Sequence, residues 1–283
     1  MNETPKAGPP NPGPIERVVV PLDAASESHA AIDTAARLAA RAKAPLHGVF
    51  VEDEDLLHLA SLPFARQFSL GAGVEKLTQE AVELHQKAAA ERARAEFLAA
   101  AKRHGVTGTF EVVRGASESA MSGASERDLV VAGGLTRPID RHFRLECRWW
   151  SSIAVTRGPF LLVRHAWGAR GAVVMLLRDR SRASTRLLAA AADIAEAGDR
   201  ALTVICPPAV AGRAGLEKWI AERLAGSPVR LDIEVAPSEP AALRARIDQL
   251  GCRLLAIDAS EDGRGDRLRE FVERFACDLL VVR

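Results

Sequence analysis

The stretch that decides the fold reads DLVVAGG at residues 128–134, LTRPIDRHFRLECRWWSSIAVTRG at 135–158 and PFLLVR at 159–164. An apolar run ends at a double glycine, a polar and basic segment follows, and a second apolar run ends on an arginine. In a parallel α/β protein this order predicts a strand, a loop with a helix, and another strand. The loop then leaves the carboxyl end of a strand, where such folds bind their ligands.

A weaker copy of this pattern closes the chain. It consists of RLLAIDAS at 253–260, a charged helix-like segment, and DLLVVR at 278–283. The length of 283 residues suits two domains of ordinary size. We therefore expect an α/β protein of two tandem, doubly wound, five-stranded parallel-sheet domains, at 15–166 and 170–283. Residues 1–14 contain five prolines and two glycines, which predict a disordered tail.

Short apolar runs bounded by turn residues predict the strands. They lie at 18–22, 46–51, 109–113, 128–132 and 160–163 in the first half, and at 173–177, 202–205, 229–235, 253–257 and 279–282 in the second. Periodic segments predict the helices. The first helix is expected to begin after Ser26 or Ser28, and the others lie at about 75–104, 115–127, 181–196, 216–224, 239–250 and 267–275.

Two features of the first half concern the segment between its second and third strands. Residues 56–75 contain one proline and two glycines and are expected to be irregular, as a surface excursion or a lid. The long helix that follows is expected to bury a stripe formed by Leu77, Ala81, Leu84 and Ala88.

Composition excludes several classes of partner and site. The 38 basic and 37 acidic residues give a net charge of +1, which supports neither nucleic acid nor an anionic membrane as a partner. No run of 18 apolar residues is present, and the N-terminus has no apolar core of a signal peptide. The four cysteines are far apart and form no CxxC pair, so we expect a reducing cytoplasm and no disulfide framework or metal site.

With the order of elements in place, the chain resembles the universal stress protein family. The resemblance rests on VVVPLDAASES at 18–28, GASESAMSGASERDLVVAGG at 115–134 and PFLLVR at 159–164, and it is weaker over 171–283. It implies a tandem universal stress protein with a five-stranded parallel sheet in each domain. It also implies that domains pair through their last strands, so the two halves are expected to pair with each other.

Many members of this family bind ATP through G-x2-G-x9-G-[S/T] after the fourth strand, with an acidic residue at the end of the first strand. Asp23 and Gly133 match the first-strand acid and the first glycine. With the last strand ending at Arg164, the second glycine becomes Thr136 and the terminal pair becomes Glu146-Cys147. A carboxylate near a bound phosphate is repulsive by about 1 kcal/mol or more in a partly desolvated site.

A register that starts at Gly134 does not restore the motif, because its partners become Arg137 and Cys147-Arg148. In the second half, Asp258 is expected directly after the fourth strand, followed only by Gly263 and Gly265 in a charged loop. The candidate nucleotide-binding residues are therefore remnants: Asp23, Gly133 and Gly134.

Other features of 134–152 have two interpretations each. Arg137, Arg141, Arg144 and Arg148 share one face of a helix if this segment is helical. That face is either a patch for an anion or acidic partner, or a solvated face paired with nearby acids. Trp149-Trp150 point in different directions around a helix and cannot both face one core, so one is expected to pack against the sheet and the other is a candidate interface residue.

Three functional hypotheses follow. The first is a non-enzymatic cytoplasmic stress-response protein that acts through protein contacts or self-association, with no cofactor and with ATP binding lost or weak. The second is that the first half binds ATP, another adenine nucleotide or a small anion. The third is a nucleotide hydrolase, although no set of base, nucleophile and oxyanion donors is visible. Asp23 also has a purely structural interpretation, as the cap of the following helix.

Overall fold

The computed structural model describes residues 15–24, 29–69, 73–116, 121, 123–133, 153, 155–165, 171–211, 215–237, 239–259 and 275–283. Contacts between Cα atoms divide the chain into two compact units, built mainly of Glu16–Thr156 and of Gly168–Arg283. The predicted tail at 1–14, most of the helix predicted at 267–275 and part of that at 115–127 lie outside the described residues.

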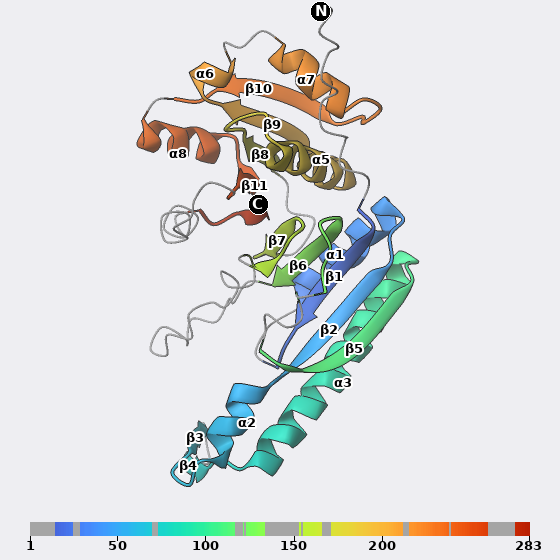
Figure 1. The fold of residues 1–283 in the computed structure, drawn as a ribbon, viewed down its shortest axis with the longest axis vertical. Helices are drawn as coiled ribbons and strands as arrows, with labels where there is room; N and C mark the ends of the chain where they lie inside the picture. The colour runs from blue at the N-terminus through green and yellow to red at the C-terminus, as the bar shows by residue number, and fades with distance from the viewer. Residues whose placement is uncertain are drawn as a thin grey trace, which may run out of the picture. The chain divides into compact units, whose positions relative to one another are not determined.

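Each half of the chain is built from alternating strands and helices (Figure 1). The first half contains β1 (Arg17–Leu22), α1 (His29–Ala42), β2 (Leu46–Asp53), α2 (Glu54–Ser61), β3 (Arg66–Ser69), β4 (Gly73–Lys76), α3 (Gln79–His104), β5 (Gly108–Gly115), β6 (Asp128–Gly133) and β7 (Phe160–Val163). The second half contains β8 (Ala172–Leu176), α5 (Arg182–Ala197), β9 (Ala201–Cys206), α6 (Pro208–Ala211), α7 (Leu216–Arg223), β10 (Arg230–Val235), α8 (Pro240–Gln249), β11 (Cys252–Asp258) and β12 (Asp278–Val282).

The two halves have the same strand order, which confirms the predicted fold class. The order is β7-β6-β1-β2-β5 in the first half and β10-β9-β8-β11-β12 in the second. In both cases the third, second, first, fourth and fifth strands lie in that sequence, and every pairing resolved between their strands is parallel. Most of these strands are buried along nearly their whole length, which is why short apolar runs predicted them, whereas β5 and β10 consist of half-buried and exposed residues.

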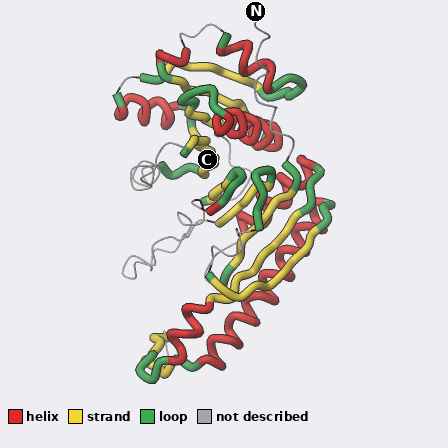
Figure 2. The backbone as a smooth tube through the Cα atoms, viewed as in Figure 1, coloured by secondary structure: helices red, strands yellow, loops and turns green. Residues whose placement is uncertain are grey.

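The long helix α3 packs along β2 and β5 (Figure 2). Its buried face differs from the predicted stripe. Leu77 is buried but precedes the helix, while Leu84 is 71% exposed and Ala81 and Ala88 are exposed. The buried residues are Val82, Gln86, Ala89, Ala90, Phe97, Ala100 and Ala101. The predicted stripe assumed that only apolar residues face the sheet, but the buried face of α3 includes Gln86. The Gln86 Nε2 donates to the Asp53 carbonyl oxygen over 3.0 Å.

Phe97 anchors α3 against the sheet. Its side chain is fully buried, and its ring lies 5.6 Å from that of Phe110 on β5. Gly48 and Gly108 provide the space, because a Cβ added to either would come within 2.9 Å of a neighbouring side chain. The helix begins at the cap Thr78 and ends at Gly105, whose φ of 66° suits a glycine.

The expectation of an irregular segment at 56–75 is wrong. Helix α2 begins at the cap Asp53, which accepts a hydrogen bond from the Leu56 amide, and β3 and β4 form an antiparallel hairpin. A small separate core holds this region together: Leu57, Ala60, Ala65, Leu77 and Val82. These apolar residues follow no single period in the sequence, because they come from a helix, a hairpin and the start of α3.

Two acidic side chains tie further elements together. Asp33 on α1 accepts hydrogen bonds from His104 over 3.0 Å and Arg103 over 3.1 Å, both near the end of α3. Glu234 on β10 pairs with Arg246 on α8, at 2.8 Å to Nε and 2.6 Å to Nη2.

In the part of the chain that the structure describes, no helix has the length and apolar character needed to cross a membrane.

Candidate functional site

The first half has its topological switch point between β1 and β6. The chain leaves β1 toward β2 on one side and returns to β6 on the other, and open α/β sheets bind their ligands at the carboxyl ends of the strands at such a point. Asp23 directly follows β1 and is partly exposed, and Gly133 is the last residue of β6. The structure therefore brings these two predicted residues to the same edge of the sheet.

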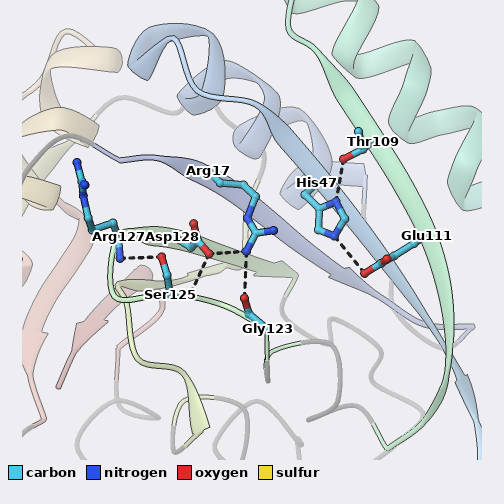
Figure 3. Close-up of polar contacts among 8 residues, drawn as sticks. All are labelled: Arg17, His47, Thr109, Glu111, Gly123, Ser125, Arg127 and Asp128. Atoms are coloured by element: carbon cyan, nitrogen blue, oxygen red, sulfur yellow. Dashed lines mark hydrogen bonds and ion pairs between the residues drawn. The ribbon is translucent and has the colours of Figure 1, made fainter.

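The opposite, amino-terminal ends of β1 and β6 are held in register by a polar cluster (Figure 3). Arg17 and Asp128 form an ion pair at 2.6 Å, and the Arg17 guanidinium also donates to the Gly123 carbonyl oxygen at 3.1 Å. The Asp128 carboxylate accepts a further hydrogen bond from the Ser125 amide at 2.8 Å. Because Asp128 is only 3% exposed, these partners stabilise a charge that would otherwise be costly to bury.

A second polar group in Figure 3 joins β2 to the edge strand β5. His47 Nδ1 lies 2.8 Å from the Thr109 hydroxyl, and His47 Nε2 lies 3.2 Å from the Glu111 carboxylate. His47 thus links two neighbouring parallel strands through its side chain.

The remaining predicted residues of the first site lie outside the described residues. This applies to Gly134, to the Arg137, Arg141, Arg144 and Arg148 face, and to Trp149-Trp150. Their proposed roles stay predictions from the sequence.

The second half has the equivalent switch point between β8 and β11. Asp179 follows β8 by a short turn, and Asp258 is the last residue of β11 itself. The prediction that Asp258 comes after the strand was therefore one residue off. The two carboxylates stand at the carboxyl ends of adjacent parallel strands, in the region where the first half has Asp23 and Gly133.

A fully buried serine connects the two carboxylates. The Ser184 hydroxyl lies 2.9 Å from Asp179 Oδ1 and 3.3 Å from Asp258 Oδ2. The hydroxyl of Ser181, the residue that caps α5, donates to the Ser184 hydroxyl at 3.3 Å. Asp258 is only 6% exposed, so the network holds a buried acidic side chain at the carboxyl end of β11, beside the second switch point.

The pKa of Asp179 is lowered from its usual value. Burial acts to raise this pKa, but the Ser181 amide and the Ser181 and Ser184 hydroxyls donate to the carboxylate, and Arg178 adds a favourable charge. Together the donors outweigh burial, so Asp179 remains a carboxylate at neutral pH.

The same contacts satisfy the start of helix α5. A helix N-terminus binds anions because its first amide groups lack partners within the helix. Here the Ser181 amide donates to Asp179 at 2.8 Å, and the Ser184 amide donates to the Ser181 hydroxyl at 3.1 Å. Two amides that a phosphate would need are thus engaged by the chain's own side chains.

Among the residues that the structure describes, no group of three or more His, Cys, Asp or Glu side chains is arranged to hold a metal ion. Sequence reasoning identified Asp258 but missed Ser184 as its partner. The spacing Asp179-x-Ser181-x-x-Ser184 at a helix start was the available signal, and it reads as ordinary capping.

Comparison with known proteins rests on structure. No protein-family model matches the sequence, and no curated protein matches it either. A universal stress protein from Archaeoglobus fulgidus DSM 4304 is similar in structure, with a TM-score of 0.68 and 11% identity, over 94% of this chain and 96% of that one.

This chain has the universal stress protein fold. A putative universal stress protein from Pseudomonas aeruginosa UCBPP-PA14 is also similar, with a TM-score of 0.57 and 16% identity, over 95% of this chain and 93% of the other. A functionally unknown protein from Pseudomonas aeruginosa PAO1 has a TM-score of 0.56 and 16% identity, over 95% and 92%. At these identities the likeness establishes the fold, and function has to be argued from the sites.

Proposed function

We propose that this chain is a non-enzymatic, cytoplasmic stress-response protein of the universal stress type, which acts through protein contacts and has lost or weakened ATP binding. The observation that carries the proposal is the Asp179–Ser184–Asp258 network at the second switch point. It places acidic side chains at the switch point, where a nucleotide would be expected to bind, and it engages the Ser181 and Ser184 amides at the start of α5. In the first half, the sequence supports the same conclusion through Glu146 at a motif position.

Phosphate exclusion is electrostatic in this proposal. At about 4 Å, two unit charges of like sign repel by about 4 kcal/mol at the effective dielectric constant typical of a protein surface. Such a penalty corresponds to a loss of roughly a thousandfold in affinity. With nucleotide binding weakened, contacts with proteins, including pairing of the two halves through their last strands, remain as the means of action.

A second candidate function is favoured by one observation. Asp23 and Gly133 lie at the same edge of the first sheet, beside the switch point. This placement supports binding of an adenine nucleotide or a small anion by the first half, aided by the arginine face at 137–148. In that case Asp23→Ala abolishes binding, and Arg141→Glu weakens it.

A thermal-shift screen separates the two candidates. The purified protein is heated with ATP, ADP, AMP, cyclic nucleotides and inorganic phosphate, each with and without magnesium. Our proposal predicts that no compound moves the melting curve. A shift that disappears in Asp23→Ala would establish the second candidate, and release of phosphate from ATP by the pure protein would contradict the non-enzymatic assignment.

A further inference from the structure

Two cysteine side chains meet at the start of the last two strands of the second half. Cys252 is the first residue of β11, and Cys277 directly precedes β12. Their thiols form a hydrogen bond to each other. Nothing in their sequence spacing indicates this contact.

A β-bulge at the start of β11 accounts for the meeting. Against β8, Cys252 pairs with Ala172, and Leu254 pairs with the very next residue, Val173. Arg253 is therefore an extra residue in the ladder, as in a bulge, which redirects side chains near it. As a result, Cys252 and Leu254 point to opposite faces of the sheet rather than to the same face.

The pairing with β12 completes the geometry. Leu254 lies opposite Asp278, and consecutive strand residues point to opposite faces. Cys277 therefore points away from the Leu254 face, which is the direction that the bulge gives to Cys252. Without the extra residue the two thiols would stand on opposite faces of the sheet.

The backbone spacing suits a covalent bond between the two sulfurs. The register with Leu254 opposite Asp278 places Cys277 level with Arg253, one residue along the strand from Cys252. A strand spacing of about 4.8 Å and a rise of about 3.3 Å per residue put the two Cα atoms about 6 Å apart, within the range of about 4.4–6.8 Å that disulfides join. Cys277 is buried, but Cys252 is partly exposed, and Gly251 and Ala276, which precede the two cysteines in the chain, are exposed, so small oxidants can reach the pair from this side. Cys206 is fully buried and lies on another strand, where its thiol donates to the Glu234 carbonyl oxygen at 3.5 Å.

The two thiols are not equivalent. The hydrogen bond with Cys277, followed by burial, raises the pKa of Cys252 far above its usual value. Cys252 therefore keeps its proton and donates it toward Cys277 Sγ. Because the thiolate is the reactive form of cysteine and Cys252 keeps its proton, Cys277 is the better candidate for the attacking thiol.

We propose that Cys252 and Cys277 are an oxidation site, at which a peroxide converts the two thiols into a reversible intramolecular disulfide. In the first step the Cys277 thiolate attacks a peroxide oxygen, the O–O bond breaks, and a sulfenic acid forms with release of water or hydroxide. In the second step Cys252 Sγ attacks Cys277 Sγ, the S–O bond breaks, and the oxygen leaves as water with the proton of Cys252. Overall, two thiols lose two electrons and hydrogen peroxide becomes two waters.

Peptide mapping tests this site directly. Cleavage after arginine places Cys252 in the peptide 247–253 and Cys277 in 275–283, each with a single cysteine. The full chain is treated with hydrogen peroxide, alkylated and digested without reductant. We expect the two peptides to appear joined, with loss of two titratable thiols per chain that dithiothreitol restores.

Variants locate the chemistry. Cys206→Ser is the matched control and should form the disulfide at the wild-type rate. In Cys252→Ser, dimedone should trap a sulfenic acid on Cys277, whereas in Cys277→Ser the labelling of Cys252 should fall by at least about tenfold. A disulfide that uses Cys147 or Cys206, or peptides 247–253 and 275–283 that remain separate after peroxide, would overturn the proposal.

Discussion

Replacement of Ser184 by alanine tests the carboxylate network at the second switch point. Ser184 is fully buried, and its hydroxyl lies 2.9 Å from Asp179 Oδ1 and 3.3 Å from Asp258 Oδ2. A buried hydrogen bond to a charged group contributes about 1.5–3 kcal/mol. Ser184→Ala should therefore lower the free energy of unfolding by about 2 kcal/mol, measured by urea denaturation followed by circular dichroism at pH 7.

A matched control exists in the same half. Ser227 donates its hydroxyl to the Glu196 carboxylate at 3.3 Å, but Ser227 is only partly buried. Ser227→Ala should therefore cost less than about 1 kcal/mol. Equal losses in the two variants, or a more stable Ser184→Ala protein, would refute the reasoning.

The pH dependence of the same variant has a definite sign. Because the pKa of Asp179 is lowered on folding, its contribution to stability is present above the unfolded-state pKa and is lost as pH falls through the lower folded-state pKa. Ser184→Ala removes part of that contribution. The difference between wild type and variant should therefore be full at pH 7 and narrow as pH falls below about 4. A difference in stability that stays constant from pH 7 to pH 3 would show that Ser184 does not act through the Asp179 carboxylate.

Two further predictions concern the first half. Phe97→Ala should lower the free energy of unfolding by about 3–5 kcal/mol, because it opens a cavity beside Phe110, whereas Leu98→Ala, with Leu98 42% exposed, should cost much less in the same urea titration. Asp33→Asn should cost about 1 kcal/mol at pH 7 and nothing in strong acid, since hydrogen bonds from His104 and Arg103 outweigh burial and lower the pKa of Asp33. An Asp33→Asn loss that persists below the folded-state pKa would contradict this ion-pair account.

Much of the fold was predictable because most of the parallel strands are buried on both faces and are therefore contiguous apolar runs; β5 and β10 are the more exposed exceptions. Phe160–Val163 was located to the residue, and most other strands were located to within two residues at each end. The hairpin β3–β4 was missed because apolar and polar residues do not alternate regularly along its two short strands, and because glycines lie next to them. The face of α3 was misplaced because Gln86 is buried through a hydrogen bond to a backbone carbonyl, which no hydrophobic pattern records.

The sites were less predictable, for a physical reason. Asp23 and Gly133 could be placed because Asp23 directly follows a recognisable strand and Gly133 ends another. The link between Ser184 and Asp258 spans 74 positions of sequence, and the contact between Cys252 and Cys277 depends on a bulge at Arg253. Such contacts follow from strand order and register, which become visible only once the sheet is assembled.

Isothermal titration of the full chain with ATP and magnesium tests the central claim most directly. The acidic network of the second half and the altered motif of the first predict no heat beyond dilution at low micromolar nucleotide. Binding at low micromolar affinity with a magnesium-dependent signal would contradict the proposal that this chain has lost or weakened ATP binding.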